Sequence, residues 1–384
     1  ANGGRGETVS SVIASQALEH IKEEGKIDLT KYDSDEDNDI DAIYFVYDYP
    51  QDSGESGSSI NLFWAYYDSA KRNFIDDGTK YNTTAPYLSS YSWSSVDFLG
   101  ENYLSTNIVE SNTFIHETGH LLGLDDYYNT NPKPRSVSGK SGSGIYQPTG
   151  FMDMMDYNLG DHSSFSKYVL GWTTPKVVKD EGEITLKSFS QTGDFVLIPN
   201  GDWNGTVFDE YLLVEYFTPT GLNNSYSFPT YQYFDAENNE RVFKYPTDHG
   251  VRVYHIDARL GYFDSRSPTC AHTYIDDPKL SDWASLNKGR YIDINNTNAT
   301  PGYVDSSVPV LISLFEASGK NNFYHGIGAD NSTLFKRGDD FGYSTYQDFQ
   351  FNKVKSDNIK YQLDYKFKII KMDTEEVTIK FEKK

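Results

Sequence analysis

The chain has 384 residues, of which 37% are hydrophobic and 15% aromatic, and its net charge is −22. This length and apolar content are sufficient for a substantial packed core and exclude a mainly disordered chain. The negative charge argues against nucleic acid or an anionic membrane as a partner. Cys270 is the single cysteine, so no intrachain disulfide forms. No run of eighteen apolar residues occurs, so we expect no membrane span.

The first predicted elements are an amphipathic helix over Val9–Glu24 and, after an acidic loop, a strand over Ala42–Tyr47. In the loop, Asn38 stands where calcium-binding loops usually have a glycine at positive φ, a conformation that asparagine tolerates. The glutamate expected at position twelve is replaced by Tyr44, so the loop is not a complete EF-hand. A solvated acidic turn is the alternative. We predict a Ca²⁺ site with carboxylates from Asp33, Asp35, Asp37, Asp39 and Asp41.

A zinc-site motif, HETGHLLGLDD, begins at His116. On a helix, His116 and His120 lie one turn apart, so both imidazoles can bind one ion. A catalytic zinc needs about three protein ligands, an open position for water and a carboxylate that accepts the proton of that water. Glu117 is predicted to be that carboxylate. Gly123 should end the helix and let Asp126 return as the third ligand, with Asp125 as the less favoured alternative.

The residues around this motif predict a helix that starts earlier. Asn107 and Glu110 have the spacing of a capping-box variant. Ile108, Ile115 and Leu122 recur every seven residues and predict a buried apolar face, which Val109, Phe114 and Leu121 widen. We therefore expect the helix to be largely enclosed and the metal to lie in a cleft.

Three of the four methionines lie in the segment GFMDMMDY, which follows a loop rich in Ser, Gly and Lys over residues 131–150. Ordinary core packing could explain them. After an extended zinc motif, the cluster resembles the methionine turn of metzincin-like peptidases, with Met155 as the turn residue. The resemblance then gives Tyr157 a role in stabilising the oxyanion, and a structural role for Tyr157 is the alternative.

After about residue 175 the sequence changes to short alternating strands separated by Asn, Gly and Asp turns. An antiparallel hairpin is predicted from apolar residues at alternate positions over 361–369 and 377–381. His255 and Asp257 share one face of a predicted strand and could bind a second ion or one another. A core histidine with satisfied hydrogen bonds is the preferred interpretation. The histidines at 162, 249, 272 and 325 are assigned no role.

The combination of HETGHLLGLDDYY, GFMDMMDY and FSKYVLGW resembles the immune inhibitor A family of secreted bacterial metallopeptidases. In that family the third ligand is Asp and an LGW segment closes the catalytic domain. The acidic loop and the strand after it are also similar to the family's sequence. Weaker similarities extend downstream, over residues 210–215, 250–257, 315–319 and 334–339.

The resemblance implies an α+β fold with a metzincin-like zinc peptidase domain over residues 1–175. An antiparallel, β-rich and sandwich-like domain is expected over residues 176–384. Family members are made with an export signal and a propeptide. We therefore expect a secreted protein. This sequence contains no signal peptide, and Ala1-Asn2-Gly3-Gly4 resembles a processed or artificial start rather than a translation start.

The predicted function is a zinc endopeptidase that hydrolyses peptide bonds of extracellular proteins. Zn²⁺ would be held by His116, His120 and Asp126, and Glu117 would transfer the proton. The alternative is a non-catalytic adhesion or carbohydrate-binding protein with a vestigial zinc domain. The presence of Glu117 together with all three ligands argues against that alternative. The sequence does not predict the cleavage specificity or the oligomeric state.

Overall fold

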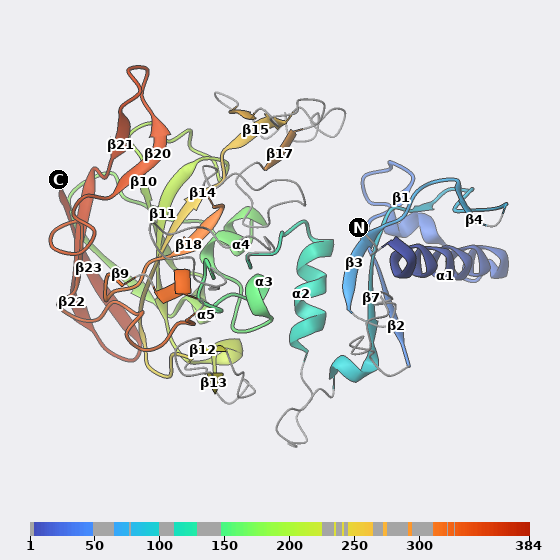
Figure 1. Cartoon of the computed structure of the whole chain (residues 1–384), viewed down its shortest axis with the longest axis horizontal. Coiled ribbons are helices and arrows are strands. Elements are labelled where there is room, and N and C mark those ends of the chain that lie inside the picture. The colour runs from blue at the N-terminus through green and yellow to red at the C-terminus, as the bar shows by residue number, and fades with distance from the viewer. Residues whose placement is uncertain are drawn as a thin grey trace. The chain divides into compact units, whose positions relative to one another are not determined.

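The computed structural model describes residues 4–48, 65–76, 78–99, 111–128, 147–224, 234–235, 240–241, 245–263, 272–274, 291–293, 310–320, 322–325 and 327–384. The chain is mixed α/β, with mostly sheets, few helices and a β-rich C-terminal region (Figure 1). Its contacts divide it into an N-terminal unit, Ala1–Leu124, and a C-terminal unit, Asp125–Lys384. The predicted domain boundary at residue 175 is based on a change in the sequence pattern and not on contacts between residues. It stays a prediction.

The N-terminal unit has two α-helices, two short 3-10 helices and seven strands in its described part. They are α1 (Gly4–Glu24), η1 (Leu29–Tyr32), β1 (Asp39–Ile40), β2 (Ile43–Tyr47), β3 (Tyr66–Ser69), β4 (Phe74–Asp76), β5 (Thr79–Tyr81), β6 (Tyr87–Leu88), β7 (Ser90–Ser95), η2 (Val96–Leu99) and α2 (Asn112–Leu121). The predicted helix over Val9–Glu24 is confirmed by α1, and the strand predicted over Ala42–Tyr47 by β2.

The main sheet of this unit has the order β2-β7-β3, with β2 parallel and β3 antiparallel to β7. Successive residues of a strand point to opposite faces of its sheet. On β7, the Tyr91 hydroxyl bonds Ser10 and Ser11 of α1, at 2.8 and 3.0 Å. Ser92 instead donates to the Glu117 carbonyl of α2, at 3.0 Å. The two helices therefore lie on opposite faces of the sheet, as Figure 1 also shows.

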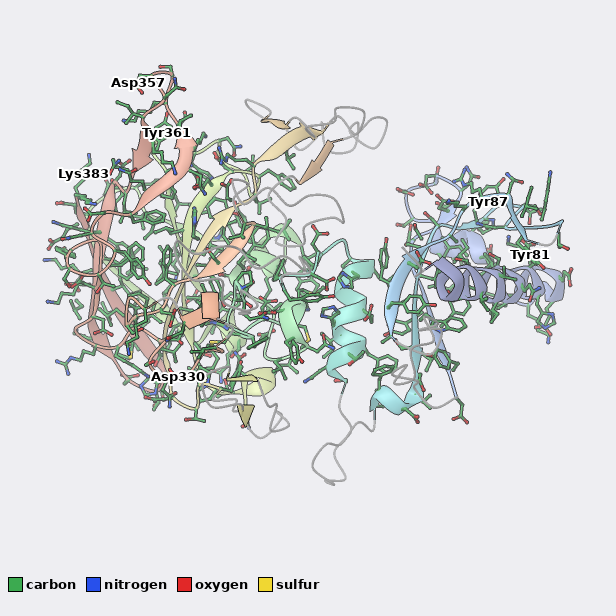
Figure 2. The ribbon with its side chains drawn as sticks, in the orientation of Figure 1. Tyr81, Tyr87, Asp330, Asp357, Tyr361 and Lys383 are labelled. Carbon is green, nitrogen blue, oxygen red and sulfur yellow. The ribbon has the colours of Figure 1, made fainter. Side chains whose placement is uncertain are left out.

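Ala14 and Leu18 of helix α1 share one hydrophobic core with residues of the strands, namely Ile40, Leu88, Tyr91 and Trp93. Further along the helix, the Gln16 amide donates a hydrogen bond of 3.3 Å to the hydroxyl of Tyr81, which Figure 2 labels. Apolar packing and polar contacts at successive positions along the helix thus set its position over the sheet.

The buried face of α2 differs from the predicted one. The described helix begins at Asn112, and Leu122 at its end is 49% exposed, so the predicted Ile115–Leu122 face is wrong. The buried positions are instead His116, Glu117 and Gly119. The physical reason is that α2 packs on β7 and β3, with the Glu117 carbonyl bonded to Ser92, so the sheet rather than the apolar repeat decides which positions of the helix are buried. The expected capping residues at 107 and 110, and the apolar residues at 108 and 109, lie outside the described residues.

The C-terminal unit is dominated by strands. Its elements are α3 (Met154–Tyr157), α4 (Ser164–Val169), β8 (Lys176–Val177), β9 (Gly182–Lys187), α5 (Phe189–Thr192), β10 (Phe195–Pro199), β11 (Glu210–Phe217), η3 (Gly221–Asn223), β12 (Phe234–Asp235), β13 (Glu240–Arg241), β14 (Gly250–Asp257), β15 (Leu260–Phe263), β16 (His272–Tyr274), β17 (Tyr291–Asp293), β18 (Ile312–Leu314), η5 (Asn322–His325), β19 (Asp340–Phe341), β20 (Gln350–Val354), β21 (Lys360–Gln362), β22 (Tyr365–Met372) and β23 (Glu376–Lys383).

Two of its sheets share one hydrophobic core. The five-stranded sheet has the order β18-β14-β11-β10-β8, and the four-stranded sheet has the order β19-β22-β23-β9. Their pairings are antiparallel except for that of β8 with β10. The shared core contains Val196, Ile198, Leu212, Val214, Val251 and Val253 from one sheet and Leu186, Phe367, Ile369, Val377, Ile379 and Phe381 from the other.

The central strand β11 is buried along its whole length. Leu212, Val214 and Tyr216 face the shared core. The alternate residues face the segment that contains α4, since Tyr168 lies against the Tyr211 ring with centroids 6.3 Å apart. Both faces of β11 are therefore covered, which explains its nearly continuous run of apolar residues.

The predicted C-terminal hairpin is confirmed as β22 and β23, an antiparallel pair around the turn at 373–375. One part of the prediction is wrong, because Tyr361 belongs to β21 and pairs with β20. The chain bends at Leu363 and Asp364, so the alternation of apolar residues continues across two separate strands. Figure 2 shows Tyr361 and Asp357 in the β20–β21 hairpin and Lys383 at the end of β23. Among the helices of the described part, none is long and apolar enough to cross a membrane.

Candidate metal centre

Helix α2 carries both histidines of the motif and ends immediately after them. The amide of Gly123 donates to the carbonyl of His120, and that of Leu124 donates to the carbonyl of Gly119, both at 2.9 Å. This pair of bonds is the Schellman motif, which needs a residue at positive φ, and Gly123 has φ of +92°. The expectation that Gly123 turns the chain after the helix is therefore confirmed.

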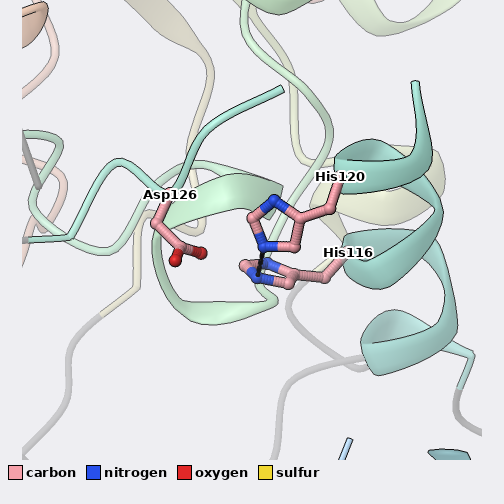
Figure 3. A group of neighbouring side chains, drawn as sticks. All are labelled: His116, His120 and Asp126. Atoms are coloured by element: carbon pink, nitrogen blue, oxygen red, sulfur yellow. Dashed lines mark hydrogen bonds between the residues drawn. The ribbon is translucent and has the colours of Figure 1, made fainter. Parts of the chain in front are cut away.

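The two imidazoles point toward the same place. The Nε2 atoms of His116 and His120 are 3.1 Å apart (Figure 3). Two nitrogen ligands of one tetrahedral zinc would be about 3.4 Å apart, given Zn–N bonds of about 2.1 Å. Nδ1 of His120 donates to the Leu124 carbonyl at 2.8 Å, so Nε2 is the unprotonated nitrogen of the neutral ring. The turn that ends the helix thus also orients the second histidine.

Asp126 completes the group. His116, His120 and Asp126 each offer one ligand atom, and these atoms lie within 4.8 Å of one another (Figure 3). Two imidazoles and one carboxylate are an ordinary donor set for a catalytic zinc, so the residues present fit this ion. Asp125, the alternative ligand, is exposed and is not part of the group.

Glu117 lies next to the first histidine and is only 6% exposed. Its backbone carbonyl accepts the Ser92 hydroxyl, which fixes α2 against β7. The pKa of the Tyr44 hydroxyl is raised mainly by burial. The negative charge of the nearby Glu117 side chain raises it further. A buried carboxylate beside two imidazoles that could hold a metal ion can accept and release a proton.

The methionine segment lies in the C-terminal unit. Met155 is fully buried, and its carbonyl accepts the Tyr127 amide at 2.7 Å. Tyr127 is the residue that follows Asp126. Tyr157 ends α3 and is 46% exposed, with its ring 5.1 Å from that of Phe151. The structure thus connects the predicted turn residue to the chain beside the third candidate ligand.

Two aspartates flank this turn and are buried. Burial raises the pKa of Asp153 to about 6, against hydrogen bonds from Met155 and Ser163. Burial, with neighbouring carboxylates as a smaller cause, raises the pKa of Asp156 to about 7. Asp156 accepts the Thr149 hydroxyl and the Phe151 amide. Both carboxylates are held by hydrogen bonds from their own segment.

In the acidic loop, only part of the predicted ligand set comes together. Asp33, Asp35 and Asp37 offer oxygen atoms within 4.8 Å of one another. Asp39 instead pairs with Arg72 at 2.6 Å, and Asp41 accepts the Ser34 amide at 3.1 Å. Asn38 has φ of +72°, as expected from its place in the loop.

His255 bonds a partner that the sequence did not predict. Its Nε2 lies 2.7 Å from Glu210, whereas Asp257 pairs with Arg259 at 2.7 Å. The carboxylate of Glu210 also accepts two backbone amides of β20. Despite its burial, the hydrogen bond from His255 and nearby positive charges hold the pKa of Glu210 below its usual range. The preferred interpretation, a histidine with satisfied hydrogen bonds, is therefore confirmed.

The sequence did not predict two tyrosines near the motif. Tyr44 of β2 stacks on Phe114 of α2 at 5.2 Å, and the Tyr67 ring of β3 lies 6.0 Å from that of His120. Both contacts join a strand to a helix that is distant in sequence, so no local pattern reveals them. Searches of known proteins found no matching family model and no curated relative with significant similarity.

Proposed function

We propose that the protein is a zinc-dependent endopeptidase of the metzincin-like kind, acting on extracellular proteins. The observation that carries the proposal is the group of two imidazoles and one carboxylate within 4.8 Å. Glu117, buried beside His116, supports it, because a vestigial site has no need of a buried proton acceptor. The similarity of the sequence to the immune inhibitor A family supports a secreted location and a protein substrate.

His116, His120 and Asp126 would hold the ion. When bound, zinc supplies a Lewis acid that polarises the scissile carbonyl and lowers the pKa of water. Glu117 takes the proton from the attacking water on a carboxylate oxygen and passes it to the leaving amine nitrogen. The Leu124 carbonyl keeps the His120 ring in the orientation that its ligand role requires. The Tyr157 hydroxyl is a candidate donor to the oxyanion.

Substitution of the proton acceptor tests this proposal. Glu117→Gln keeps the size of the side chain and removes its basicity, so proteolysis of casein should fall by roughly 100- to 10,000-fold. Zinc content, measured by metal analysis, should not change. Glu375→Gln, in the turn between β22 and β23, is the matched control and should keep full activity. Full activity in Glu117→Gln would contradict the proposal, and so would a wild-type protein that holds zinc and cleaves nothing.

A further inference from the structure

The residue after the third candidate ligand is fixed at two points within the C-terminal unit. The Tyr127 side chain is fully buried, and its amide donates to the Met155 carbonyl at 2.7 Å. Its hydroxyl bonds the Ser166 hydroxyl of α4 at 2.8 Å. Because Tyr127 is the next residue, its position limits where the Asp126 carboxylate can lie.

Asp153 in turn fixes Met155. One of its oxygens accepts the Met155 amide at 2.8 Å, and the other accepts the Ser163 amide at 2.9 Å. The carboxylate therefore connects the two ends of the segment between residues 153 and 163. It has no exposed surface, so no water can replace these bonds without a change of structure.

A buried ion pair fixes the same segment to the sheet. Arg252 of β14 lies opposite Glu215 of β11 in the strand register, and the two side chains form an ion pair with no exposed surface. Arg252 donates to the Met152 carbonyl at 3.0 Å, and Glu215 accepts the Ser164 amide at 2.8 Å. These contacts lie one residue before Asp153 and one residue after Ser163.

A buried ion pair is weak evidence for stability, because desolvation opposes its attraction. In this unit the pair also provides hydrogen bonds to the backbone on both sides of the Asp153 segment. The contacts therefore form a continuous path from the central strands, through Asp153 and Met155, to Tyr127. An apolar pair of similar volume would fill the space but could not provide this path.

We propose that Asp153, supported by the Arg252–Glu215 pair, is a positioning residue that sets the place of the Asp126 carboxylate for the metal. This inference rests on the proposed function. Asp153 does not touch the ion or the substrate in this role. Asp153 restricts the conformations of the Asp126 segment before an ion binds, so less conformational entropy is lost on binding. Its contribution is therefore to metal affinity and to the geometry of the ligands.

The test uses the intact chain with Co²⁺ as the probe, because the visible absorption of cobalt reports the geometry of its ligands. Asp153→Asn keeps the volume, but its amide group cannot accept both backbone donors. We expect roughly 10- to 100-fold weaker Co²⁺ binding, as for other residues that orient a metal ligand, and an altered absorption band. The binding is measured in neutral buffer, where Asp153 is ionised.

Asp209→Asn is the matched control. Asp209 is 1% exposed and also accepts two backbone amides, those of Asn204 and Glu210, at 2.6 and 2.8 Å. Its loss should lower the melting temperature without changing Co²⁺ affinity. Tyr127→Phe removes only the bond to Ser166 and should weaken binding by a smaller factor, which decides the matter if Asp153→Asn does not fold.

The outcomes separate this inference from the proposed function. Unchanged Co²⁺ affinity and absorption in Asp153→Asn and Tyr127→Phe would overturn the positioning role and leave the proposed function intact. An equal loss of affinity in Asp209→Asn would also overturn it, because the effect would then be general destabilisation. If Asp126→Ala binds Co²⁺ as the wild type does, the proposed metal centre itself is wrong.

Discussion

In the part of the chain that the structure describes, two groups of side chains could hold a metal ion, and they differ in donors and burial. The group of His116, His120 and Asp126 combines two nitrogens with one oxygen and is mostly shielded from solvent. The group of Asp33, Asp35 and Asp37 has only carboxylate oxygens and is mostly exposed. The first set suits zinc, and the second suits a hard cation such as Ca²⁺.

The groups also differ in how the protein holds their ligands. His120 is oriented through Nδ1, so its Nε2 is left for the ion. In the acidic loop, Asp33 accepts the amides of Asp37 and Asn38 at 3.0 Å on the two oxygens that an ion would also need. One candidate ligand of the first group is therefore oriented by the protein itself. In the second group, the two oxygens of Asp33 would have to accept the backbone amides and bind the ion at the same time.

The largest expected effect is loss of the buried group through its third ligand. Asp126→Ala should remove most of the approximately one zinc per chain, and proteolysis with it, because two histidines alone bind zinc weakly. Asp125→Ala is the control and should keep both. Metal analysis after dialysis measures the difference. If Asp125→Ala lost the zinc instead, the choice of third ligand would be wrong.

A smaller effect is expected at Tyr157. If its hydroxyl donates to the oxyanion, the interaction exists only in the transition state. Tyr157→Phe should then lower kcat by roughly 10- to 1,000-fold with KM and zinc content nearly unchanged. Steady-state kinetics on a peptide substrate checks this. Full activity would show that Tyr157 is structural, as its contact with Phe151 also allows.

Burial near the first group should also produce a pH dependence. Burial raises the pKa of Asp153 from 3.8 to about 6, so the folded state binds this proton more tightly than the unfolded state. Its favourable contribution to folding is complete below about pH 4 and is lost as the pH rises to about 6, a change of about 3 kcal/mol. The free energy of unfolding, measured in urea, should fall between about pH 4 and pH 6 in the wild type by about this amount more than in Asp153→Asn. Parallel pH profiles would show that Asp153 is not perturbed.

The exposed group should give the smallest effect. If Asp33, Asp35 and Asp37 bind Ca²⁺, the ion stabilises only the folded state, by about 1.4 kcal/mol at a concentration tenfold above Kd. Thermal unfolding should therefore shift upward by a few degrees with added Ca²⁺. An unchanged curve, in Ca²⁺ and in a calcium-selective chelator, would remove this site from the comparison.

A pair of variants sharpens the calcium test. Asp35→Asn removes a member of the group and should abolish the Ca²⁺-dependent shift. Asp39→Asn should preserve it, because Asp39 pairs with Arg72 rather than with the group. A loss of the shift in Asp39→Asn alone would mean that the ion binds on the other side of the loop.

Local features were predictable from sequence. Helix α1, strand β2 and the β22–β23 hairpin follow from periodicity, and the positive φ of Asn38 and Gly123 follows from what those residue types tolerate. The candidate zinc group was predictable because its residues lie within eleven positions. Contacts that join distant segments were not predictable.

The Arg252–Met152 bond is one such contact, since it joins residues 100 positions apart. The buried polar face of α2 is another, because which face of a helix is buried depends on the partner as well as on the apolar pattern. Leu122 shows this, as it fits the apolar repeat and is nevertheless 49% exposed. Sequence thus predicts the ligands more readily than the residues that position them.

At Gly123, a single backbone torsion angle sets the direction in which the chain leaves α2 toward Asp126. A Cβ at this position would meet no atom within 4 Å, so alanine would be disfavoured only by the φ of +92°. The chemistry of the ligands would be unchanged while the direction in which the chain leaves the helix shifted. A substitution at position 123 would therefore change the path of the chain between His120 and Asp126 without altering any of the three side chains.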